Sequence, residues 1–60
     1  MKYYYYVVYE GFNFTGRSEV GLDHKVANLD DVRSMEKILA EKDHHLKDAM
    51  IVNFIFLREE

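Results

Sequence analysis

The sequence predicts an α+β domain in which two strands, a helix and a third strand form a ββαβ unit. Five tyrosines and four phenylalanines lie in two terminal blocks, and aromatic residues favour strands. The middle of the chain instead repeats apolar residues at helical spacing. With 60 residues, the chain is expected to form one domain over residues 1–60.

The first strand is expected over about residues 2–10. Residues 3–9 are all aromatic or β-branched, and the segment contains no glycine or proline. Successive residues of a strand point to opposite faces, so this strand carries large apolar side chains on both. Such a strand is typical of the centre of a sheet.

The second strand is expected over about residues 15–25. Ser18, Val20 and Leu22 alternate there with charged residues and glycine. This pattern predicts one buried face and one solvated face, as in an edge strand.

The helix is expected over about residues 28–42. Asn28 is a good N-cap, and Asp30 and Asp31 fall in the first turn, where acidic side chains favour the helix dipole. An apolar stripe at helical spacing predicts the face that packs on the sheet. Its members are Leu29, Val32, Met35, Ile38 and Leu39.

The third strand is expected over about residues 49–57, after a polar connection at 43–47 and before a charged tail at 58–60. It is apolar on both faces apart from Asn53. Strict alternation divides its other residues into two sets. One face receives Ile51, Ile55 and Leu57, and the other receives Met50, Val52, Phe54 and Phe56.

The simplest topology is a fully antiparallel, three-stranded sheet in the order 2-1-3, with the helix on one face. The sequence does not decide which face the helix covers. One helix covers only one face, so the other is left with an apolar patch larger than soluble monomers tolerate. The third strand is also an apolar edge.

We therefore expect a homodimer joined through the sheet, either by pairing of edges or by stacking of faces. The interface candidates come from the first strand, the first loop and the third strand. They are Tyr4, Tyr6, Phe12, Phe14, Ile51, Ile55 and Leu57.

Gly11, Asn13 and Gly16 supply turn chemistry between the first two strands. Phe12 and Phe14 lie among them. These rings either fold back to cap the core or form an exposed aromatic tip that enters a partner. The glycines have neither the spacing nor the lysine of a phosphate-binding loop.

The sequence predicts a protein that is not an enzyme and that holds no metal or cofactor. It has no cysteine, and no serine or threonine has a convincing base nearby in sequence. His24, His44 and His45 lack a recognised ligand spacing. We interpret His44 and His45 as solvated residues that help to satisfy the carbonyl groups at the end of the helix.

The net charge of −3 argues against binding to phosphate backbones, which needs clustered lysine and arginine. The chain has no apolar run of membrane-spanning length and no recognisable signal peptide, so we expect a cytoplasmic protein. The leading hypothesis is a protein-binding module that self-associates. The alternatives are a sponge that sequesters a nucleotide at the dimer interface and a single-strand nucleic-acid binder that uses the sheet tyrosines.

Three segments carry a resemblance: the opening Met1–Val7, the helix from Leu29 to Lys42, and Ile51–Ile55 near the end. In pattern they resemble small uncharacterised proteins of phages and prophages of Gram-positive bacteria. The resemblance implies a protein in the cytoplasm of a host cell that binds and blocks a host protein, such as a component of antiviral defence. It carries over no functional residue.

Overall fold

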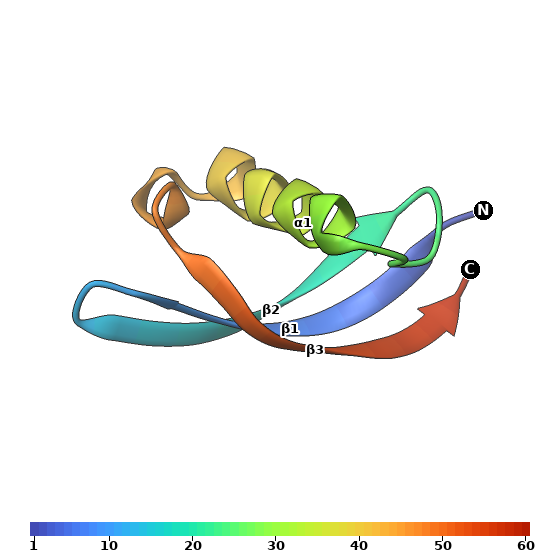
Figure 1. The fold of residues 1–60 in the computed structure, drawn as a ribbon, viewed down its shortest axis with the longest axis horizontal. Coiled ribbons are helices and arrows are strands. Elements are labelled where there is room, and N and C mark those ends of the chain that lie inside the picture. The colour runs from blue at the N-terminus through green and yellow to red at the C-terminus, as the bar shows by residue number, and fades with distance from the viewer.

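The computed structural model describes residues 1–60 and confirms the ββαβ fold. The strands β1 (Tyr3–Gly11), β2 (Phe14–Leu22) and β3 (Met50–Glu59) form an antiparallel sheet in the order β2-β1-β3. The helix α1 (Leu29–Lys42) lies across one face of this sheet (Figure 1). A single 3-10 turn, η1 (His44–Leu46), connects α1 to β3. We call the face opposite α1 the open face, because no helix covers it.

The core lies between α1 and the β1–β2 hairpin. Each of its buried side chains comes from one of these elements, and none comes from β3. They are Tyr5, Val7, Val20, Leu22, Met35 and Leu39. The alternation in β2 predicts its buried face correctly. In β1 the hydroxyl of Tyr5 accepts the Val26 backbone N–H at 2.8 Å.

Asn28 caps α1 as predicted, because its side-chain oxygen accepts the backbone N–H of Asp31 at 3.1 Å. Most of the apolar stripe faces the sheet. Its first member does not, since Leu29 is 63% exposed. The prediction that Leu29 belongs to the core stripe is therefore wrong.

The β1–β2 hairpin turns more tightly than the glycines suggest. Gly11 pairs with Phe14, so only Phe12 and Asn13 form the loop. Asn13 has a φ of 68°, a left-handed conformation that asparagine tolerates. Gly16 is not a turn residue. It lies within β2 opposite Tyr9, whose ring occupies the space that a side chain would need.

Both edge strands differ in length from the prediction. β2 ends at Leu22 rather than near Lys25, because the chain leaves the sheet there to reach α1. β3 continues through Arg58 to Glu59, which pair with Tyr4 and Tyr3. The tail residues thus belong to the sheet.

The predicted division of β3 into two faces is correct in separating Ile55 from Phe54 and Phe56, but wrong in grouping Ile51 with Ile55. The pairing of β3 with β1 shifts register between Tyr4 and Tyr5 and again between Val8 and Tyr9. Each shift is a β-bulge, and an extra residue reverses which face the following side chains take. Cross-strand partners share a face, so pairing decides the sides. Ile51, Phe54 and Phe56 lie on the α1 side, opposite Tyr9, Val7 and Tyr5, whereas Asn53 and Ile55 lie on the open face, opposite Val8 and Tyr6.

Candidate functional site

The most exposed apolar side chains of the sheet lie together along β3. Six of them are 38–60% exposed. We call this set the β3 surface: Met50, Val52, Phe54, Ile55, Phe56 and Leu57. No charged residue lies between Asp48 and Arg58, and Asn53 is the only polar residue in this run. Contiguous apolar surface of this kind marks an interaction site more often than an ordinary surface.

The part of the β3 surface on the α1 side continues the aromatic core. The ring of Tyr5 contacts those of Phe54 and Phe56 edge-on, with centroids 5.9 and 5.4 Å apart. Lys25 places its Nζ 5.4 Å from the centroid of Phe56. α1 does not extend over these rings, because its buried residues pack on β1 and β2. Phe54 and Phe56 therefore pack against Tyr5 on one side and are exposed to solvent on the other.

The outer edge of β3 has no neighbouring strand. Two side chains accept hydrogen bonds from backbone N–H groups of this strand. A carboxylate oxygen of Glu36 on α1 accepts the N–H of Ile51 at 2.8 Å, and the amide oxygen of Asn53 accepts the N–H of Phe54 at 2.9 Å. No side chain bonds the backbone of Phe56. The edge is thus protected near its start and unprotected toward its end.

The open face combines half-buried tyrosines with paired charges. The guanidinium of Arg58 lies 4.5 Å from the ring centroid of Tyr4 and pairs with Glu19 at 3.0 Å and Glu60 at 3.1 Å. These hydrogen bonds, to Glu19 and then to Glu60, raise the pKa of Arg58 above its usual value. Tyr6 lies between Glu19 and Ile55. The positive charge beside the tyrosines is therefore neutralised by neighbouring carboxylates.

The two phenylalanines of the hairpin behave differently. Phe12 is 90% exposed at the tip, whereas Phe14 packs edge-on against Tyr9 and covers Gly11. The loop thus contains one ring that folds back and one that projects into solvent. The tip lies at the opposite end of the sheet from the chain termini (Figure 1).

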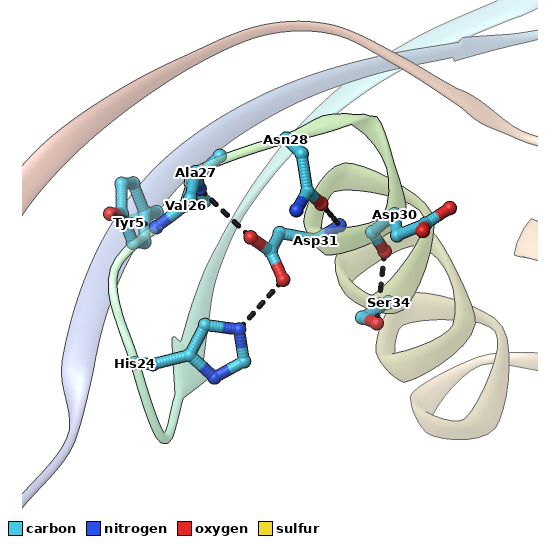
Figure 2. Close-up of polar contacts among 8 residues, drawn as sticks. All are labelled: Tyr5, His24, Val26, Ala27, Asn28, Asp30, Asp31 and Ser34. Atoms are coloured by element: carbon cyan, nitrogen blue, oxygen red, sulfur yellow. Dashed lines mark hydrogen bonds and ion pairs between the residues drawn. The ribbon is translucent and has the colours of Figure 1, made fainter.

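A polar cluster fixes the start of α1 (Figure 2). His24 Nε2 lies 2.6 Å from Asp31 Oδ1, and the backbone N–H of Ala27 donates to Asp31 Oδ2 at 2.8 Å. An ionised carboxylate only accepts hydrogen bonds, so Nε2 is the donor. These bonds, that from His24 first, hold the pKa of the Asp31 carboxyl below its usual value. The sequence pattern did not reveal this pair, because seven positions separate its members.

The histidines do not come together. His24 contacts the start of α1, whereas His44 and His45 follow its end in η1. Their predicted capping role is wrong, because the backbone N–H of Asp43 bonds the carbonyl of Leu39, and the Asp43 carboxylate accepts the N–H of His45. Both rings are exposed.

The structure contains no metal-binding cluster, surface pocket or membrane-spanning helix. No group of three or more histidine or carboxylate side chains could hold a metal ion. No pocket opens on the surface of the single chain. No helix has the length and apolar character needed to cross a bilayer.

The structure brings together only part of the predicted interface. Ile55 and Leu57 lie in the β3 surface, and Tyr6 lies beside Ile55 on the open face. Ile51 instead packs half-buried at the core, and Phe12 lies at the hairpin tip. Phe54 and Phe56 were not among the candidates. The sequence feature that could have identified them is the uncharged run from Ala49 to Leu57. This run holds more apolar residues than a core beneath one helix can bury.

Comparisons with protein-family models, curated proteins and solved structures found no match. The phage setting therefore rests on the resemblance of the sequence segments alone.

Proposed function

We propose that this chain is a protein-binding module that self-associates through β3. One observation supports the proposal more than any other: β3 contributes six exposed apolar residues and no buried one. A strand that only closed a sheet would alternate polar and apolar residues. A second protein surface that covered these side chains would gain the free energy of their burial.

The chemistry of the sheet favours a protein over a nucleic acid. Bases stack on exposed aromatic rings that lie among unpaired lysine and arginine. Here Arg58 is held by Glu19 and Glu60, and Lys2 lies 3.8 Å from Asp23. Lys25 lies beside Phe56 as a single cation and not as part of a basic cluster. A phosphate backbone would have to displace these carboxylates.

Sedimentation equilibrium at micromolar concentration tests the self-association. The wild type should sediment as a dimer of the 7.2 kDa chain. Ile55→Lys should sediment as a folded monomer, because Ile55 is 55% exposed in the single chain and a charge there is costly only in an interface. Phe12→Lys is the control. It also places a charge on an exposed apolar residue, but at the hairpin tip, six residues beyond the Tyr6 that pairs with Ile55, and should leave the dimer intact.

A wild type that remains a monomer across this concentration range would contradict the proposal. Circular dichroism of Ile55→Lys must show the wild-type spectrum. An unfolded variant would mean that Ile55 supports the fold rather than an interface, which also contradicts the assignment.

The host-protein partner implied by the resemblance forms a second part of the proposal. The observation that favours it is Phe12, a bare aromatic ring at a hairpin tip, which is the kind of anchor that fills a partner's pocket. We expect Phe12→Ser to lose the host protein in affinity capture and to keep its self-association. If Phe12→Ser retained the host protein as well as the wild type did, the tip would have no role in binding.

A further inference from the structure

We propose that two copies of the chain pair antiparallel along the free edges of β3, with Ile55 on the two-fold axis. The two sheets then form one continuous sheet. This inference rests on the self-association proposed above and specifies its partner, its edge and its register.

The first step concerns which backbone groups point outward. Lys2 and Glu60 exchange both backbone hydrogen bonds, at 2.8 Å each. In an antiparallel ladder every second residue bonds the same neighbour. The even-numbered residues of β1 therefore bond β3, and their partners Arg58, Ile55 and Asn53 point inward. Phe54 and Phe56 direct their N–H and carbonyl groups to the free edge.

The second step uses the two bulges. They interrupt β3 near Val52 and Leu57, and bulges disrupt regular pairing. Only Asn53–Phe56 is regular between them, and only Phe54 and Phe56 within it point outward. A two-fold axis must match outward groups with outward groups. Only one register keeps both outward residues within the regular segments of the two copies: Phe54 pairs with the partner's Phe56, and the axis falls on Ile55.

The third step concerns the side chains that this register joins. Ile55 faces the partner's Ile55 in a non-hydrogen-bonded pair, the closest kind of cross-strand pair, with Cα atoms about 4.5 Å apart. On the α1 side, Phe54 lies beside the partner's Phe56. The aromatic cluster of Tyr5, Phe54 and Phe56 thus continues across the axis into its symmetric copy.

The charge pattern identifies a second copy as the occupant. Ala49–Leu57 contains no charged residue. A positively or negatively charged partner strand would therefore find no opposite charge to pair with. A strand that is uncharged and apolar on both faces matches itself best. In the single chain the Asn53 amide oxygen occupies the Phe54 N–H. Pairing replaces that bond with a backbone carbonyl of the partner, so the donor is satisfied in both states.

Single-cysteine variants test the register directly, because the chain has no cysteine of its own. Ile55→Cys should form a disulfide-linked dimer under mild oxidation, since a Cα separation of about 4.5 Å suits a disulfide. Tyr6→Cys is the matched control. Tyr6 neighbours Ile55 on the open face, but lies roughly 14 Å from its symmetric copy, three strand spacings away. Phe12→Cys measures random collision.

Efficient linkage at Ile55, with Tyr6 and Phe12 at the collision level, supports the proposal. Linkage at Tyr6 as efficient as that at Ile55 would show that open faces stack, which overturns edge pairing while the self-association stands. A dimer by sedimentation that links at neither position overturns the register. A wild-type monomer would overturn both proposals.

Hydrogen exchange provides a second measurement that needs no substitution. Edge pairing occupies the Phe56 N–H, which no side chain bonds in the single chain. Its exchange should slow by about tenfold or more as protein concentration rises through the dimer range. The Ile51 N–H, already bonded to Glu36, should change little. Equal exchange of Phe56 in monomer and dimer would contradict the pairing.

Discussion

β1 and β3 have similar apolar content, yet one is the centre of the core and the other is the most exposed strand of the sheet. Tyr5 and Val7 of β1 are buried, whereas the paired residues Phe56 and Phe54 of β3 are about two-fifths exposed. β1 has a strand on each side and α1 above it. β3 has one neighbouring strand, and none of the buried residues that pack beneath α1 comes from it.

This difference teaches that position, more than composition, decides burial in a domain this small. A 60-residue chain buries only about 60% of the surface that its unfolded form exposes, and a single helix of 14 residues covers about two strands. The apolar residues beyond that limit collect in β3. This surplus is a disadvantage in an isolated chain, and in our proposal it is the basis of self-association.

The largest effect should come from the covered region. Leu39→Ala should lower the free energy of unfolding by about 2–5 kcal/mol, because Leu39 is buried between α1 and the sheet and its removal leaves a cavity. Leu29→Ala makes the same change on the same helix at an exposed position and should cost under about 0.5 kcal/mol. Urea unfolding followed by circular dichroism measures both. Similar decreases in the free energy of unfolding of the two variants would contradict the difference between the covered and the exposed region.

A pair of valine substitutions compares the strands directly. Val20→Thr places a hydroxyl in the core, where Val20 is 2% exposed, and should cost about 1–3 kcal/mol. Val52→Thr makes the same change in β3, where the side chain is 52% exposed, and should cost under about 0.5 kcal/mol. Both should be measured in Ile55→Lys, so that association does not contribute. A costly Val52→Thr would mean that β3 is packed within the single chain.

The stability that the loop between β2 and α1 contributes to the fold should depend on pH. The pKa of Asp31 is lowered in the folded chain, so its ionised form stabilises the fold above the unfolded pKa of about 3.9. That contribution is lost as the pH falls through the lower, folded pKa. Asp31→Asn should therefore be less stable than the wild type near neutral pH, and the difference should shrink on acidification.

Asp30→Asn is the control for this pH effect. Asp30 is exposed in the same helical turn, and its side chain has no hydrogen bond. Its difference from the wild type should stay small throughout urea titrations at several pH values. A pH dependence equal to that of Asp31→Asn would assign the effect to the helix dipole rather than to the His24–Asp31 bond.

The smallest effect should come from η1, which belongs to neither region. Replacing His44 and His45 together by asparagine should leave stability, sedimentation and binding unchanged, because both rings are exposed. Calorimetric titration of the wild type with zinc should show no stoichiometric site. A tight isotherm that the double variant abolishes would contradict this expectation.

Local patterns in the sequence were sufficient to predict most of the fold. The aromatic and β-branched run of residues 3–9 predicts a central strand, and Asn28 with the apolar stripe predicts α1 nearly residue by residue. The surface was harder to predict. The bulges of β3, the exposure of Leu29 and the bond between His24 and Asp31 depend on how separate elements meet, and no local pattern records that.

The sequence by itself determined the elements, their order in the sheet and an excess of apolar residues, since these follow from local spacing and from the limits of one helix. Tertiary structure alone decided where the excess lies. The bulge at Val52 placed Ile51 on the α1 side with Phe54 and Phe56, while Ile55 lies on the open face. The physical reason is that a strand's faces depend on its register against a neighbour, and a single extra residue reverses them.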